Sequence, residues 1–416
     1  MDKYIINGNK KLSGSVKVQS AKNAILPLLA ASILTSDEVV IENCPKIFDV
    51  LSMIKLLNKL GIKTFFQEDN LVINASGITG CKLGNELTKE LRSSVFLMGS
   101  LVSRTGCATM AYPGGCDIGL RPIDLHINAL RALGVNINEF GGEIRCFAER
   151  IVGKEIYLDF PSVGATENVM LATAISEGTT IINNPAKEPE IVDLMNFLNK
   201  MGAKIHGAGT GKIIIEGVKK LHGIKYKPIG DRIEAGTFLI AGAITGGTVE
   251  VRGVNKENLT PLLNKLLNNT CNIRVKDDII LLKSGISRKG FDIETSPYPG
   301  FPTDLQAQAL ALATVSNGIS IIRENIFETR FKHVNELIKL GADIVVKDRI
   351  AIVRGVKQLN CGEVYAHDLR GGAALVLAGL NASGATVVND IRHIERGYYR
   401  FEDKISMLGG DIKKIK

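Results

Sequence analysis

Two hydrophobic patterns alternate along this 416-residue chain. Stretches rich in alanine and leucine occupy residues 24–35, 169–176, 237–245, 305–316 and 373–381. Their apolar residues recur at helical spacing, which predicts helices with a wide buried face. Each stretch is followed by a turn signal and a run of alternating β-branched residues, at residues 36–43, 177–184, 246–253, 317–324 and 383–390. These runs predict half-buried strands, and the alternation of the two patterns predicts an α/β fold.

A second helical signature ends in glycine and leads into another strand-like segment. It recurs at residues 54–66, 128–140, 195–207, 261–275, 335–346 and 401–415. A glycine at this point suits a helix C′ cap in the left-handed conformation. The residues concerned are Gly61, Gly134, Gly202, Gly341 and Gly409, with Asn268 in the glycine's place in the fourth copy. Residues 61 and 268, 134 and 341, and 202 and 409 lie 207 positions apart, which predicts two halves of three repeats each.

The repeats also predict the domain organisation. An α/β unit of about 70 residues cannot bury both faces of its helices alone, so three units must pack together. We expect two similar domains of three units, with ligand bound in the cleft between them. Proline and glycine mark the boundary at residues 227–230, and the phase of the repeat assigns residues 1–20 to the second domain. The predicted domains are 21–229 and 1–20 plus 230–416, joined by two crossings that allow closure.

Composition narrows the possible functions. The net charge of +8 fits small anionic substrates, and because no run of five basic residues occurs, it favours nucleic acid only weakly. The longest apolar runs, 24–34 and 373–380, are shorter than the roughly 20 residues of a membrane span. The polar first ten residues argue against export. We therefore expect a cytoplasmic protein with no membrane span.

Cysteine and histidine usage bears on redox state and on metals. Seven widely spaced cysteines, an odd number, predict reduced thiols in a cytoplasmic protein. The six histidines form no H-E-x-x-H motif, and no C-x-x-C occurs. We expect neither a metal site nor a cofactor.

The segment 112–125, Y-P-G-G-C-D-I-G-L-R-P-I-D-L, is the strongest candidate for chemistry. Gly114 and Gly115 predict a mobile loop that carries Cys116. Arg121 lies five residues later, and a nearby cation favours the reactive thiolate. A buried cysteine on a tight turn is the alternative, but the Gly-Gly setting and the neighbouring charges favour a reactive group.

Polar residues at predicted helix starts are further candidates. Helix N-termini attract anions, so Lys22, Arg92 and the Ser162–Thr166 segment could bind phosphate groups, although a first-turn lysine or arginine is often simply solvated. Asp124 could either favour its helix dipole or bind a ligand. Asp304 could be an N-cap or, if it faces the cleft, a general base. Three arginines occupy matching loop-to-helix junctions and could converge on a carboxylate and a phosphate: Arg330, Arg370 and Arg396.

These motifs, taken together, resemble the enolpyruvyl transferases, specifically the members whose acceptor is UDP-N-acetylglucosamine. The resemblance covers essentially the whole chain and rests on S-A-K-N-A (20–24), P-G-G-C-D-I-G-L-R-P-I-D-L-H (113–126), D-F-P-S-V-G-A-T (159–166), D-R-I-E-A-G-T-F (231–238), F-P-T-D-L-Q-A-Q (301–308) and H-I-E-R-G-Y (393–398). It implies two inside-out α/β barrels that close on the nucleotide sugar. It also implies transfer of the enolpyruvyl group of phosphoenolpyruvate to the 3-hydroxyl of the sugar, with release of phosphate, in the first committed step of peptidoglycan synthesis.

The resemblance assigns roles to individual residues. Lys22, Arg121 and Arg396 would hold the phosphate of phosphoenolpyruvate, and Arg330 and Arg370 its carboxylate. Cys116, which fosfomycin alkylates in this family, would be the general acid, and Asp304 would deprotonate the hydroxyl. Contacts with the nucleotide sugar would come from Asn23, Arg92, Arg121, Pro122, Ile123, Asp124, Leu125, Ser162, Val163, Gly164, Asp304 and Ile326.

Some positions depart from the family pattern, and three other functions have to be weighed against the predicted one. Phe160 stands where some members carry lysine, and Gly371-Gly372 is richer in glycine than expected. The nearest rival is the sister enzyme that acts on shikimate 3-phosphate, but that enzyme lacks the P-G-G-C loop. A related barrel protein that acts on RNA ends is disfavoured by the scarcity of aromatic residues, 5%. A catalytically silent regulatory copy is disfavoured because every acid, base and cation named above is present.

Overall fold

The predicted helices form the centres of two units that fold around separate cores. The computed structural model describes residues 2–114, 123–285 and 287–415. Unit 1 contains residues 2–19 and the described part of 230–415, and unit 2 contains residues 20–114 and 123–229. The chain passes between the units after Gln19 and again after Ile229.

Unit 1 is built around three helices that pack against one another: α8 (Arg232–Thr245), α10 (Gln306–Ala313) and α12 (Leu369–Asn381). Almost all of their residues are buried, because sheets and outer segments cover them on every side. The outer helices are α9 (Thr260–Asn268), α11 (Val334–Lys339) and α13 (Phe401–Met407). Short 3₁₀ helices are η3 (Lys256–Leu259), η4 (Thr303–Leu305) and η5 (Ile391–Arg396).

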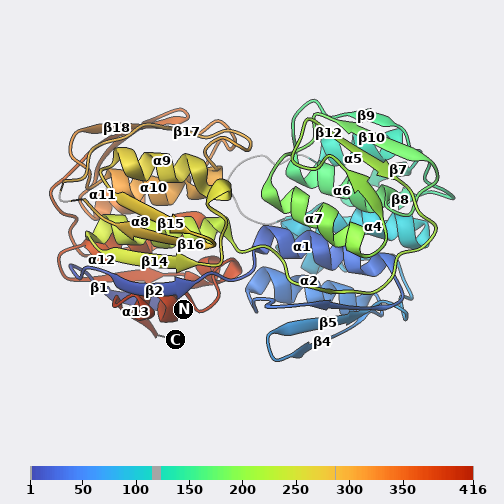
Figure 1. Ribbon diagram of the computed structural model, residues 1–416, viewed down its shortest axis with the longest axis horizontal. Helices are drawn as coiled ribbons and strands as arrows, with labels where there is room; N and C mark the ends of the chain where they lie inside the picture. Colours follow the sequence, from blue (N-terminus) through green and yellow to red (C-terminus); the bar gives the residue numbers. More distant parts are fainter. Residues whose placement is uncertain (1, 115–122, 286, 416) are drawn as a thin grey trace. The chain divides into compact units, whose positions relative to one another are not determined.

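Three four-stranded sheets lie outside these helices (Figure 1). Their strand orders are β21 (Glu363–Tyr365), β22 (Ala385–Asn389), β1 (Lys3–Asn7), β23 (Asp411–Ile415); β15 (Asn272–Lys276), β16 (Ile279–Lys283), β14 (Thr248–Arg252), β2 (Ser13–Lys17); and β17 (Ile293–Glu294), β18 (Ile319–Arg323), β20 (Ile350–Arg354), β19 (Asp343–Lys347). Each sheet has one parallel pair at an edge and two antiparallel pairs. Buried and exposed residues alternate along the strands, so each sheet turns one face to the core.

The N-terminal segment belongs to unit 1. Strand β1 lies between β22 and β23, and β2 lies beside β14. The end of the segment is fixed by Gln19, whose backbone N–H donates to the buried Glu234 carboxylate at 2.7 Å. Lys404 neutralises that carboxylate at 2.6 Å. The first crossing between the units therefore starts from a rigidly held residue.

Unit 2 has the same plan. Its inner helices are α1 (Lys22–Ala31), α4 (Phe96–Thr105) and α6 (Val163–Thr173), with α4 packed against both others. Its outer helices are α2 (Phe48–Lys59), α3 (Asn85–Glu90), α5 (Asp124–Ala132) and α7 (Pro189–Lys200), with 3₁₀ helices η1 (Ser32–Leu34) and η2 (Arg92–Val95). The strand orders of its sheets are β13 (Lys225–Tyr226), β3 (Glu38–Ile41), β5 (Asn70–Asn74), β4 (Lys63–Gln67); β11 (Lys204–His206), β12 (Lys212–Glu216), β10 (Thr179–Asn183), β9 (Glu155–Tyr157); and β6 (Cys107–Ala111), β8 (Glu143–Phe147), β7 (Asn136–Phe140).

The predicted strands are confirmed as β3, β10, β14, β18 and β22. The predicted alanine- and leucine-rich helices are confirmed as α1, α6, α8, α10 and α12, and all of these except α10 begin earlier than predicted. Helix α6 begins at Val163, six residues before its apolar run, because Ser162 caps it. The prediction for Asn268 was wrong: Asn268 lies inside α9, and the left-handed residue after this helix is Thr270, with φ 74°. The predicted glycine caps Gly61, Gly134, Gly202, Gly341 and Gly409 do have positive φ.

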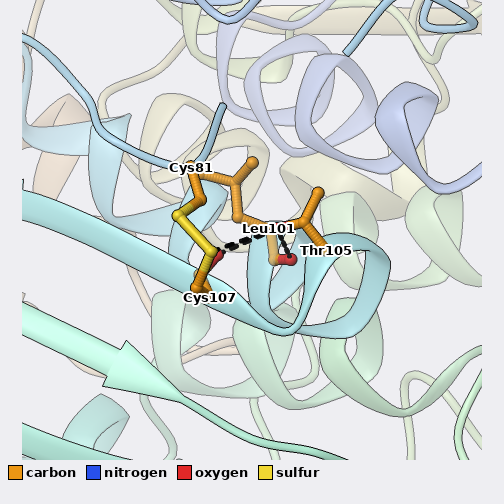
Figure 2. The surroundings of a disulfide bond; sticks show 4 residues. All are labelled: Cys81, Leu101, Thr105 and Cys107. Atoms are coloured by element: carbon orange, nitrogen blue, oxygen red, sulfur yellow. Dashed lines mark hydrogen bonds between the residues drawn. A yellow bond between two sulfur atoms is a disulfide. The ribbon is translucent and has the colours of Figure 1, made fainter. Parts of the chain in front are cut away.

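The expectation that all thiols are reduced is also corrected. Cys81 and Cys107 form a disulfide, with their Cα atoms 5.7 Å apart (Figure 2). The two cysteines meet because the segment after Cys81 runs parallel to β6: Thr109 N–H donates to the Cys81 carbonyl at 2.7 Å. Thr105 tightens the turn before β6 by donating to the Leu101 carbonyl at 2.8 Å. Cys44, Cys146, Cys271 and Cys361 are free thiols.

Within the part of the chain that the structure describes, no helix combines the length and hydropathy needed to cross a membrane.

Candidate active site

The most highly charged buried cluster of unit 1 joins three predicted site residues. Asp304 lies in η4, where the chain enters α10, and accepts hydrogen bonds from two arginines. Its Oδ1 lies 2.8 Å from Arg330 Nη2, and its Oδ2 lies 2.9 Å from Arg370 Nη2. The junction residues Arg330 and Arg370 thus meet at Asp304, an arrangement that the sequence pattern did not predict.

The first turn of α12 fixes Arg370. Asp368 caps this helix, and its Oδ1 accepts the backbone N–H groups of Arg370 and Gly371, both at 2.9 Å. The Arg370 guanidinium lies over the Tyr398 ring, 5.4 Å from its centroid. The Tyr398 hydroxyl in turn bonds to Thr237 at 2.9 Å. Buried side chains from α8 and from the turn between η5 and α13 therefore support this guanidinium of α12.

A second buried carboxylate holds the segments that carry Asp304 and Ile326. Glu324 is fully buried, and its Oε2 accepts from the Thr303 hydroxyl at 2.9 Å. Its Oε1 accepts from the backbone of Ile326 at 2.9 Å and of Phe327 at 3.1 Å. The sequence prediction missed Glu324. A glutamate directly after strand β18 was the available signal.

The electrostatics of the cluster are strongly coupled. Burial by itself raises the pKa of Asp304, but the adjacent Arg370 and Arg330 outweigh it and hold that pKa well below its usual range. Burial lowers the pKa of Arg370, and Asp304 and Tyr398 raise it above its usual value. Asp304 is therefore ionised near pH 7 and lies between two positively charged arginines.

The arginines keep unused hydrogen-bond donors. Arg330 Nε and Arg370 Nε are buried and have no partner. The nearby His333 is also buried, with neither ring nitrogen hydrogen-bonded. Burial, partly opposed by Asp368, lowers the His333 pKa to about 4, so this ring is neutral near pH 7. Because unpaired buried polar groups are costly, such a cluster is typical of a binding site.

Arg396 is the remaining predicted residue of unit 1. It is the last residue of η5 and is partly exposed. Ile326 is also partly exposed.

In unit 2, Lys22 is the first residue of α1, and its Nζ pairs with Asp49 Oδ2 on α2 at 2.7 Å. Asn23 follows it and is exposed. Arg92 begins η2, and its Nη1 donates to the Pro113 carbonyl at 3.3 Å. Arg92 therefore holds the start of the segment that continues to Cys116. Cys116, Arg121 and Pro122 themselves lie outside the described residues.

The start of α6 groups further predicted residues. Ser162 Oγ accepts from Ala165 N–H at 3.3 Å, and Val163 and Gly164 form the first turn. Gly164 lies against the His126 ring so closely that a side chain would meet its Cε1 at 2.8 Å. His126 Nδ1 lies 2.7 Å from Asn168 Nδ2. The remaining three predicted residues lie at the start of α5. Ile123 directly precedes the helix and is buried, Asp124 is its exposed first residue, and Leu125 is partly exposed.

Phe160, the departure noted before α6, is 46% exposed. Among residues 2–114, 123–285 and 287–415, no group of three or more histidine, cysteine, aspartate or glutamate side chains is placed to share a metal ion.

Comparisons with known proteins agree along the whole chain. Residues 6–405 match the family model described as EPSP synthase (3-phosphoshikimate 1-carboxyvinyltransferase). The chain is 50% identical over 416 residues to UDP-N-acetylglucosamine 1-carboxyvinyltransferase 2 of Caldanaerobacter subterraneus subsp. tengcongensis, covering 100% of both chains. It is 48% identical over 417 residues to the protein of the same name from Carboxydothermus hydrogenoformans, again covering 100% of both.

Two solved structures show the same α/β fold. The enolpyruvyl transferase NikO from Streptomyces tendae superimposes with a TM-score of 0.90 at 25% identity, covering 99% of this chain and 98% of that one. An EPSP synthase from Acinetobacter baumannii superimposes with a TM-score of 0.76 at 19% identity, covering 100% of both chains.

Proposed function

Because the chain belongs to the EPSP synthase family of enolpyruvyl transferases, we propose that it transfers the enolpyruvyl group of phosphoenolpyruvate to the 3-hydroxyl of UDP-N-acetylglucosamine. Phosphate is the second product. The observation that carries the proposal is the pair of buried arginines, Arg330 and Arg370. Together they can bind a carboxylate beside the ionised Asp304. The relatives named for this reaction share about half of the sequence over its full length, which favours the nucleotide sugar as acceptor.

The reaction divides into an addition and an elimination. In the addition, the oxygen of the 3-hydroxyl bonds to the substituted enol carbon while Asp304 takes the hydroxyl proton. Cys116 gives a proton to the terminal carbon. The tetrahedral product then loses that proton and expels phosphate, which restores the double bond. Lys22, Arg121 and Arg396 hold the phosphate, and Arg330 and Arg370 the carboxylate, so that cations stabilise the charge at both ends.

The remaining predicted residues bind the nucleotide sugar. Helix N-termini and polar side chains suit its diphosphate and amide groups. The residues assigned to it are Asn23, Arg92, Pro122, Ile123, Asp124, Leu125, Ser162, Val163, Gly164 and Ile326, together with Arg121 and Asp304. We further propose that each unit is an inside-out barrel of three repeats and that the enzyme works in the cytoplasm, in peptidoglycan synthesis.

Phosphate release tests this function. The protein is mixed with phosphoenolpyruvate and either UDP-N-acetylglucosamine or shikimate 3-phosphate, with and without fosfomycin. We expect release only with the nucleotide sugar, and we expect fosfomycin to block it by alkylating Cys116. Release with shikimate 3-phosphate would assign the chain to the sister activity, and no release with either acceptor would favour a silent copy.

A pair of cysteine variants tests the role of the thiol. Cys116→Ser is expected to lower kcat by about 10²–10⁴-fold, the usual contribution of a general acid. The matched control is Cys361→Ser, because Cys361 is a free, exposed thiol. This control should keep both its activity and its sensitivity to fosfomycin. Full activity of Cys116→Ser at neutral pH would remove Cys116 from the mechanism.

A further inference from the structure

Asp304 occupies the arginine pair in the way that a small carboxylate would. Each of its oxygens accepts from a different guanidinium, Arg330 Nη2 at 2.8 Å and Arg370 Nη2 at 2.9 Å. The proposed function gives this pair to the carboxylate of phosphoenolpyruvate. The side chain of Asp304 and the substrate carboxylate therefore compete for the same two cations.

This contact also suppresses the basicity of Asp304. The two arginines hold its pKa well below the usual range, and a carboxylate of low pKa is a poor acceptor for a hydroxyl proton. Asp304 becomes an effective base only when its contact with at least one arginine is broken. The structure thus places the proposed base in a form that needs to be activated.

Of the three partners, Asp304 is the one able to move. Its side chain is 25% exposed, whereas those of Arg330 and Arg370 are 3% and 4% exposed. The Thr303 hydroxyl anchors the preceding residue to Glu324, so the backbone can stay in place while the carboxylate rotates. Arg330 and Arg370 each retain a buried, unpartnered Nε–H, which gives an incoming carboxylate donors that Asp304 does not use.

We propose that Asp304 also determines which compounds can act as enolpyruvyl donor: the carboxylate of phosphoenolpyruvate replaces Asp304 on Arg330 and Arg370, and only a compound with that carboxylate releases Asp304 to accept the proton. The exchange keeps both buried cations paired, so no uncompensated charge is left in the core. This inference rests on the proposed function. It makes the acceptor hydroxyl reactive only after the correct donor has bound.

The test compares wild type with Asp304→Asn. An amide cannot hold two guanidinium groups as a carboxylate does, so the arginines become available. We expect Asp304→Asn to bind phosphoenolpyruvate at least about 10-fold more tightly by calorimetry, and to lose about 10²–10⁴-fold in kcat. Binding of the carboxamide analogue of phosphoenolpyruvate should change less than about 2-fold, because it does not compete for the charges.

The matched control is Asp343→Asn. Asp343 forms an aspartate–arginine pair with Arg354 in the same unit, at 3.3 Å on the surface. This variant should leave affinity and kcat unchanged. Unchanged or weaker binding of phosphoenolpyruvate to Asp304→Asn would overturn the exchange. Tighter binding with a normal kcat would keep the exchange but remove Asp304 as the base of the proposed function.

A second measurement uses the wild-type enzyme and remains available if Asp304→Asn does not fold. The carboxamide analogue is offered as donor up to saturation. If the arginines only bind the carboxylate, the analogue raises KM and leaves kcat near normal. The exchange instead predicts that kcat falls at least about 100-fold even at saturation, because Asp304 stays on the arginines. A kcat within tenfold of that with phosphoenolpyruvate would overturn the inference.

Discussion

Two acids in the folded chain, the partly exposed Asp304 in unit 1 and the buried Glu167 in unit 2, have opposite electrostatic surroundings. Asp304 lies between two guanidinium groups, which keep it ionised. Glu167 lies in α6, fully buried, and neither of its carboxyl oxygens has a hydrogen-bond partner. Burial raises the pKa of Glu167 well above its usual value, and Glu190 and Glu188 raise it further. The partners of a carboxyl group, together with its burial, decide whether it carries charge.

The contacts made by residues near the two acids also differ in charge. The polar cluster at the ends of α10 and α12 is held by charges. Around α6, neutral groups dominate: Asn168 accepts from Gly99 N–H at 2.8 Å and donates to the Val95 carbonyl at 2.9 Å. A covalent bond, Cys81–Cys107, fixes the nearby strand β6. We therefore expect anions to act on unit 1 and reductants to act on this part of unit 2.

The largest effect on stability is expected from removing Arg370, one of the two arginines that bind Asp304. Arg370→Met removes a buried cation and leaves the partly exposed Asp304 with Arg330 alone, and breaking a buried ion pair typically costs about 3–5 kcal/mol. Urea unfolding at pH 7 measures the loss. Arg354→Met is the matched control, because Arg354 pairs with Asp343 at the surface, where such a pair contributes at most about 1 kcal/mol.

The pH dependence of this loss checks its cause. A lowered folded-state pKa stabilises the protein above the unfolded pKa of aspartate, about 3.9, and this contribution disappears as pH falls through the folded-state pKa. The difference between Arg370→Met and wild type should therefore be full above about pH 4 and should shrink below it. The pKa of His333 depends on burial, Asp368 and Arg330, which both proteins keep. Tyr398 is coupled to Arg370, but burial raises its pKa above its usual value of about 10, so it does not titrate in this range. A loss independent of pH would mean that packing alone is responsible.

Reduction of the disulfide should have the next largest effect. A cross-link between residues 26 positions apart stabilises by about 3 kcal/mol in the chain-entropy description. We expect a dithiol reductant to lower the free energy of unfolding by this amount and to speed hydrogen exchange in β6. Cys107→Ser should show the same loss without reductant and no further loss with it. An equal response of Cys107→Ser to the reductant would assign the effect to another part of the chain.

The sequence predicted what depends on neighbouring residues along the chain. Alternation of β-branched residues located β3, β10, β14, β18 and β22, because a half-buried strand requires that pattern. The same local patterns placed Asp304, Arg330 and Arg370 at helix junctions. The regular spacing of these junctions suggested that the arginines could converge, but it did not identify Asp304 as their partner.

What the sequence did not predict depends on pairs that meet only in the folded chain. Lys22 and Asp49, Thr303 and Glu324, and Cys81 and Cys107 are each more than 20 positions apart. No local pattern marks such partners. The assignment of Asn268 failed for a related reason: a helix can end two residues later without disturbing the apolar spacing, and Thr270 then takes the left-handed turn. Glu167 escaped notice because a lone glutamate in a helical stretch usually faces solvent.

The smallest predicted effect concerns Glu167, and it has the opposite sign to the effect at Arg370. A buried acid with a raised pKa stays protonated when folded, whereas the unfolded chain ionises above about pH 4.3. Stability therefore falls as pH rises above this value. Glu167→Gln removes the ionisation and should stabilise the protein by about 1 kcal/mol at pH 5, with almost no difference near pH 3. Glu177→Gln, at an exposed pair with Arg150, is the control and should change nothing. A loss of stability in Glu167→Gln that grows with pH would show that Glu167 is an ionised, paired group like Asp304, and the contrast between the two acids would then be lost.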